Sequence, residues 1–205
     1  QYNNALARYL YMKGNTDELP YVIRTLGRTY PASYSYLKKE PFWTESVRQA
    51  FKKGLEDAIR AEISVRNSHM ILSAVFADEK NWNGAIFHYQ EALNHQAFQN
   101  NSGNYIQLGH LCLKDKQFEP AENSFLHALE FSTSREKTFE KLYSVYRAEG
   151  YPEKFYAFYH KAGEYFVLSY ETDIVVARCL ADLKEYEQAK QVLKDLNQKY
   201  ASPQA

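Results

Sequence analysis

The chain has 205 residues, enough for one large domain or two small ones. Its 25 Lys and Arg residues balance its 25 Asp and Glu residues, and the lack of a basic excess argues against a nucleic-acid binder. Apolar residues make up 45% of the chain, which excludes wholesale disorder. The longest mostly apolar stretch, residues 71–77, is far shorter than the ~20 residues that span a bilayer.

The first 65 residues predict an irregular helical region. Apolar residues recur at helical spacing on both sides of Gly14, so we expect a first pair of helices there. In the next stretch Pro41 falls where the interior of a helix should be, and proline interrupts a helix. We therefore expect a short helix at about 33–39 and a long helix from about 42 to 63, started by Pro41.

From Arg66 onward a helix–turn–helix pattern occurs four times, over residues 66–101, 102–135, 136–169 and 170–200. Its period is 34 residues, with two extra residues in the connection at 94–103. Large and small residues hold fixed places in the pattern. In the second unit these places are held by Tyr105, Leu108, Gly109, Ala121, Phe125 and Ala128. Four units in near-constant register predict a solenoid of stacked helix pairs.

The unit at 136–169 departs from the pattern. Tyr143 and Phe155 stand at places where the other units carry Ala, Gly or Ser. Because small residues let two helices cross closely, we expect the helices of this unit to be splayed or shifted. The last residues, 201–205, are expected to form a flexible tail.

This pattern resembles that of the tetratricopeptide repeat (TPR) family, clearly over residues 66 to about 200 and more loosely before them. The resemblance implies an all-α, right-handed α-solenoid of antiparallel helix pairs, about six pairs with the second irregular. It also implies a non-enzymatic scaffold that binds a peptide or partner domain in a concave groove, lined by the first helix of each unit.

The resemblance places ten candidate partner-binding residues in that groove. They are Met70, Ile106, Gln107, His110, Leu113, Lys137, Lys141, Ser144, Arg147 and Arg178. The four cations among them lie beside three apolar residues, so we expect a partner that carries both acidic and apolar side chains. The competing interpretation is a solvated helix face, in which Glu140 neutralises Lys137 and Lys141.

Chaperone-binding members of the family hold a partner's C-terminal carboxylates with a clamp of Lys, Arg and Asn side chains. Lys137 and Lys141 match the last two cations of that clamp in position and spacing. However, Met70 stands where the clamp has Lys, and Ala74 and Gln107 stand where it has Asn. A chaperone-tail function is therefore not favoured.

No motif in the sequence indicates catalysis, a metal site or a cofactor. Gly-rich phosphate loops and the CxxC, HExxH and GxSxG patterns are all missing. His88 and His95 lie two helical turns apart, too far to share a metal. Cys112 and Cys179 lie two units apart, so we expect no disulfide between them and two small buried side chains instead.

Two further interpretations stay open. Tyr156 and Tyr165 belong to a dense aromatic cluster but fall outside its packing positions, where a ring is free to stack on a ligand such as a sugar. TPR regions also follow the membrane part of O-antigen ligase-like and other polysaccharide-assembly proteins of the bacterial envelope. The start at Gln1, without a methionine, fits an excerpt of such a protein, tethered to a membrane. A cytoplasmic and a bacterial periplasmic location both stay open, as does the oligomeric state.

Overall fold

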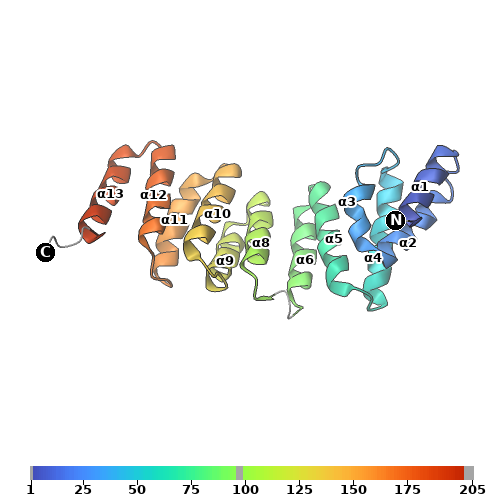
Figure 1. Ribbon diagram of the computed structural model, residues 1–205, viewed down its shortest axis with the longest axis horizontal. Helices are drawn as coiled ribbons and strands as arrows, with labels where there is room; N and C mark the ends of the chain where they lie inside the picture. Colours follow the sequence, from blue (N-terminus) through green and yellow to red (C-terminus); the bar gives the residue numbers. More distant parts are fainter. Residues whose placement is uncertain (1, 96–98, 201–205) are drawn as a thin grey trace. The chain divides into compact units, whose positions relative to one another are not determined.

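The computed structural model describes residues 2–95 and 99–200 of the chain. Within these residues there are twelve α-helices, one short 3-10 helix and no strand (Figure 1). The chain divides into two compact units, unit 1 (residues 1–99) and unit 2 (residues 100–205). The predicted all-α solenoid of helix pairs is confirmed. The tail expected at 201–205 lies outside the described residues.

Unit 1 contains the irregular region that the sequence predicts. Its elements are α1 (Tyr2–Met12), α2 (Leu19–Thr29), η1 (Pro31–Ser33), α3 (Tyr34–Leu37), α4 (Glu45–Arg60), α5 (Val65–Asp78) and α6 (Trp82–Leu93). A short helix, a break and a long helix follow one another over 31–60, as expected. The long helix does not start at Pro41, however. It starts at Glu45, because Thr44 Oγ1 caps it by accepting a hydrogen bond from the Val47 amide at 3.5 Å.

Helix α4 packs directly against α2, because α3 has only one turn and cannot separate them. Two glycines permit this close crossing. A Cβ atom on Gly54 would lie 2.0 Å from the Arg24 carbonyl oxygen, and one on Gly27 would lie 2.4 Å from the Phe51 carbonyl oxygen. Around the crossing, α2 and α4 bury the apolar side chains of Ile23, Leu26, Phe51, Leu55 and Ala58.

Unit 2 is a regular series of helix pairs. Its helices are α8 (Ser102–Lys114), α9 (Phe118–Glu130), α10 (Arg135–Ala148), α11 (Pro152–Gly163), α12 (Tyr170–Asp182) and α13 (Tyr186–Tyr200). Helix α8 packs with α9 and α12 with α13, and α10 lies next to both α8 and α12 (Figure 1). The first helices of successive pairs therefore lie side by side in this unit.

A residue with left-handed backbone follows the first helix in five helix pairs. These residues are Gly14, Lys80, Lys116, Gly150 and Lys184, with φ between 58° and 83°. The last three recur at the 34-residue spacing that the sequence predicts. Glycine adopts this conformation most readily, yet three of the five are lysines. The geometry of the turn repeats more strictly than its residue type.

Packing within the pairs follows the small residues. Ala121 is fully buried, and a Cβ atom on Gly109 would lie 2.3 Å from the Phe125 ring, so α8 and α9 cross closely. In the next pair the rings of Tyr143 and Phe155 lie between the helices, with their centroids 5.1 Å apart. As a result, α10 and α11 approach each other far less extensively than α8 and α9 do. The predicted splaying of this pair is confirmed.

Candidate functional site

The predicted partner-binding residues of unit 2 lie on its three first helices, α8, α10 and α12. Six of them are exposed and two are half-buried, and we call these eight residues the first-helix surface. They are Ile106, Gln107, His110, Lys137, Lys141, Ser144, Arg147 and Arg178. Leu113 is the exception, because it is 1% exposed and so lines no accessible surface. Met70 is half-buried on α5 of unit 1, and its place beside the other residues stays a prediction.

Two of the four cations on the first-helix surface are already paired. The Nε atom of Arg147 lies 3.1 Å from an Asp182 carboxylate oxygen, and Arg178 lies 3.2 Å from Glu140. Glu140 therefore contacts a cation on the neighbouring helix α12 rather than the lysines on its own helix. The competing interpretation, in which Glu140 neutralises Lys137 and Lys141, has no ion pair between these side chains to support it in the described part of the chain.

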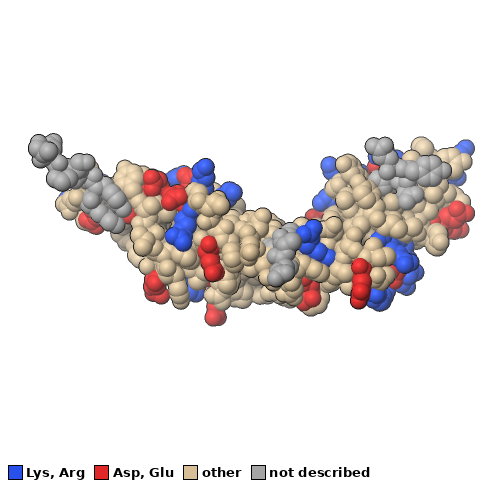
Figure 2. Space-filling model, turned by 60° about the horizontal axis from the view of Figure 1, so that its bottom comes forward, with Lys and Arg blue, Asp and Glu red and all other residues tan. Residues whose placement is uncertain are grey.

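The other two cations, Lys137 and Lys141, are exposed and lie one turn apart on α10. Within the described part of the chain, the side chain of neither lysine makes an ion pair. On the face shown in Figure 2, acidic and basic side chains are interspersed over unit 2, without a large field of one sign. The two lysines are thus the charges of the first-helix surface that remain available to a partner.

The structure also reveals a recurring contact between successive first helices. In each case, two donors four residues apart, on one helix or directly after it, bind the same carboxylate at the end of a following helix. In unit 2, Glu149 at the end of α10 accepts from His110 Nε2 at 2.6 Å and from Lys114 Nζ at 2.8 Å. Asp182 at the end of α12 accepts in the same way from the Tyr143 hydroxyl and from Arg147.

Unit 1 has the same arrangement. Asp78 at the end of α5 accepts from the Tyr34 hydroxyl at 2.5 Å and from Lys38 Nζ at 2.7 Å. Burial would raise the pKa of Asp78, but the hydrogen bonds from Lys38 and Tyr34 and the charges of Lys38 and Arg48 outweigh it and lower that pKa. We call the three arrangements carboxylate clamps. They are contacts within this chain, not the partner-binding clamp of chaperone-binding TPR proteins. They hold neighbouring first helices together, and they occupy His110 and Arg147, two of the predicted binding residues.

The two cysteines are free and buried, as the sequence predicts. Burial raises the pKa of each thiol to about 11, so neither is a reactive thiolate near neutral pH. The described residues contain no group of three or more His, Cys, Asp or Glu side chains suited to a metal ion. In residues 2–95 and 99–200, no helix has the length and apolar character needed to cross a membrane.

Neither a protein-family model nor a curated protein sequence matches the chain. Among solved structures, the MamA RS-1 ArsTM double mutant superimposes with a TM-score of 0.50 at 13% identity, covering 89% of this chain and 97% of its own. MamA from Desulfovibrio magneticus RS-1 gives 0.47 at 13%, with coverage of 85% and 97%. PilF of Pseudomonas aeruginosa gives 0.46 at 20%, with coverage of 87% and 77%.

The MamA RS-1 double mutant is a TPR-repeat protein, so its likeness to this chain supports the TPR-like fold. At 13% identity this likeness concerns the fold alone. What the chain binds has to be argued from its own side chains.

Proposed function

We propose that this chain is a non-enzymatic interaction scaffold whose first-helix surface in unit 2 binds a peptide or partner domain. The observation that carries the proposal is the pair Lys137 and Lys141. Both are exposed and without an ion pair among the described residues, whereas Arg147, Arg178 and the nearby carboxylates are paired with one another. A partner with acidic side chains would complete the pairing.

The neighbouring helices supply apolar contacts. Ile106 on α8 and Ile174 on α12 are both half-buried, so each leaves part of its side chain accessible on a helix adjacent to α10. A desolvated apolar anchor contributes most of the affinity at a typical interface, whereas exposed charges mainly raise the association rate and the specificity. We therefore expect the partner segment to combine acidic residues with at least one large apolar residue.

The proposal is tested by selecting peptides from a random displayed library on the intact chain. Selected peptides should be enriched in Asp and Glu together with Leu, Ile, Phe or Met. Their affinity is then measured by fluorescence anisotropy at low and at high salt. Binding should weaken as salt rises, because screening acts most strongly on exposed charges.

The decisive variant is Lys137→Glu with Lys141→Glu. Its matched control is Lys190→Glu with Lys194→Glu, which reverses two lysines at the same spacing on the exposed face of α13. The first variant should lose binding of the selected peptides by about tenfold or more, and the second should bind them like the parent. Equal binding by both variants, or selection of peptides without acidic residues, would refute the proposal.

A further inference from the structure

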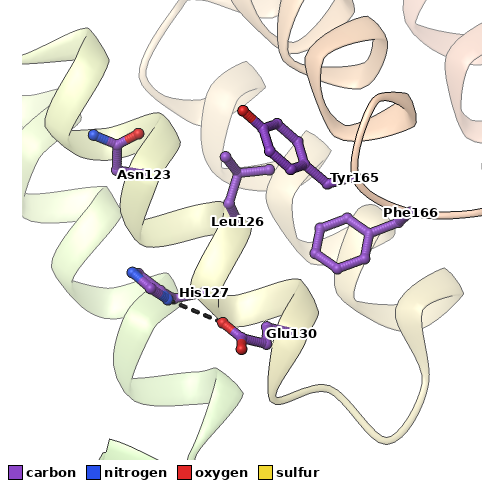
Figure 3. Close-up of a pocket in the computed structure, with 6 residues that line it drawn as sticks. All are labelled: Asn123, Leu126, His127, Glu130, Tyr165 and Phe166. Atoms are coloured by element: carbon purple, nitrogen blue, oxygen red, sulfur yellow. Dashed lines mark hydrogen bonds and ion pairs between the residues drawn. The ribbon is translucent and has the colours of Figure 1, made fainter.

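A second candidate site lies on α9, a second helix, rather than on the first-helix surface. It is a pocket of about 550 Å³ between α9 and the segment that follows α11 (Figure 3). Leu126 forms its floor, and Asn123, His127 and Glu130 line one side while Tyr165 and Phe166 line the other. Its volume is within the range of ~300–1,000 Å³ that is usual for small-molecule sites.

One wall of the pocket is polar and carries an amide, an imidazole and a carboxylate. Asn123, His127 and Glu130 follow one another at spacings of four and three residues, which places them on one face of α9. His127 Nδ1 lies 3.2 Å from a Glu130 carboxylate oxygen, and both side chains are more than half exposed. The wall therefore offers hydrogen-bond donors and acceptors that are open to a ligand.

The opposite wall is aromatic. The Tyr165 side chain is exposed, with 64% of the residue accessible, and Figure 3 shows its ring turned toward Leu126. Phe166 is half-buried, and the Arg135 guanidinium lies 4.8 Å from the centroid of its ring. An exposed aromatic ring opposite polar groups is an arrangement that binds ligands with one apolar and one polar face.

Charge narrows the class of ligand further. A cationic ligand would compete with Arg135 for the Phe166 ring and be repelled by that guanidinium. An anionic ligand would be attracted by Arg135 but repelled by Glu130, and a cationic ligand the reverse, so the two opposite charges give the pocket no net preference for either sign. A purely apolar ligand would shield the exposed Asn123 and Glu130 side chains from water without replacing the hydrogen bonds that water makes to them. The remaining class is a neutral molecule with several hydroxyl groups and an apolar face.

We propose that this pocket binds a neutral carbohydrate ring. In this arrangement the C–H face of the sugar stacks on Tyr165, and its hydroxyl groups hydrogen-bond to Asn123, His127 and Glu130. This proposal is independent of peptide binding at the first-helix surface, because the two sites share no residue.

The test is an NMR titration of the intact chain with methyl glycosides of glucose, galactose, mannose and N-acetylglucosamine at millimolar concentrations. At least one glycoside should shift the signals of residues 123–130 and 165–166. Tyr165→Ala should weaken that binding about tenfold, and Asn123→Ala should also weaken it. Because Tyr165 is exposed, its replacement should leave the remaining amide signals in place, which verifies folding.

The matched control is Tyr186→Ala, because Tyr186 is 57% exposed on α13 and lies outside the pocket. It should bind the glycosides like the parent. Tetramethylammonium and acetate serve as cationic and anionic probes. The proposal is overturned if no glycoside shifts the pocket signals, if Tyr165→Ala binds equally well, or if either ion binds there more tightly than every glycoside.

Discussion

Small residues fix how closely the two helices of a pair approach each other. Ala121 is fully buried at the crossing of α8 and α9, opposite the helix that carries Gly109. We expect Ala121→Leu to lower the free energy of unfolding by about 1–3 kcal/mol, because the added carbons have no space in this crossing. Urea denaturation measures the change. The control Ala157→Leu, at an exposed position of α11, should stay within about 0.5 kcal/mol of the parent.

The left-handed turns allow a stabilising prediction. Lys116 has φ of 59°, in a conformation where a Cβ atom is strained, and glycine holds the equivalent place after α10 at Gly150. Replacing Lys116 by Gly should therefore raise the free energy of unfolding by roughly 0.5–1 kcal/mol, because relief of about 1–2 kcal/mol of left-handed strain outweighs the extra unfolded-state entropy of glycine. The reverse change, Gly150→Ala, should lower it, although an added Cβ atom would meet no neighbour there. If Lys116→Gly is destabilising, the turn is not strained.

At the scale of helices, the carboxylate clamps join α3 to α5, α8 to α10 and α10 to α12. Burial alone would raise the pKa of Glu149, but hydrogen bonds and charges from Lys114 and His110 prevail and lower it. A carboxylate with a lowered folded-state pKa contributes stability above its unfolded pKa, and this stability is lost as the pH falls through the folded-state value. The stability that Glu149 contributes is therefore lost below about pH 4.5.

Glu149→Gln tests the clamp. The variant should be less stable than the parent near neutral pH by about 1–3 kcal/mol, because a neutral amide binds the Lys114 ammonium more weakly than a carboxylate does and cannot accept from both donors through one oxygen as well. The difference should shrink as the pH falls below 4.5, where the parent loses the same contribution. Exposed Glu187→Gln on α13 is the control and should be nearly neutral. A difference between Glu149→Gln and the parent that does not vary with pH would contradict this account.

The sequence predicted the helices and their crossings better than the clamps. The positions of Ala121, Tyr143 and Phe155 follow from a period that is visible in the chain, and their packing consequences are local. The clamp partners lie in different repeats, so their meeting depends on the rotation of one helix against the next. The ion pair between Arg147 and Asp182 could not be predicted from the spacing of residues in the sequence. Leu113 was placed in the groove by the TPR resemblance, yet it is buried near the end of α8.

At the scale of the whole molecule, unit 1 contains a pair of partly buried histidines that unit 2 lacks among its described residues. The Nδ1 atoms of His69 on α5 and His88 on α6 lie 2.9 Å apart, and the Phe76 ring stacks on His88. Burial, then His69 and then Lys52 lower the pKa of His88 to about 4. Burial also lowers the pKa of His69, assisted by His95 and opposed by Glu91.

A histidine with a lowered folded-state pKa favours folding while it is neutral. The unfolded chain takes up a proton near pH 6.5, whereas the folded chain resists protonation until about pH 4. Stability from this pair is therefore fully present above pH 6.5 and is lost as the pH falls from there toward 4. The contribution of Glu149 in unit 2 is lost only below 4.5. Between about pH 6.5 and about pH 4.5, acid should therefore destabilise unit 1 before it destabilises unit 2.

Because each helix pair of a solenoid contacts only its neighbours, such a difference should appear as local opening of one unit. Amide hydrogen exchange at about pH 7.5 and about pH 5, corrected for intrinsic rates, should show protection falling in α5 and α6 but not in α8 and α9. His69→Gln with His88→Gln should remove this pH dependence, because neither glutamine titrates. The control His160→Gln on the exposed face of α11 should keep it. Equal loss of protection in both units of the parent would show that the histidine pair does not set the acid sensitivity of the molecule.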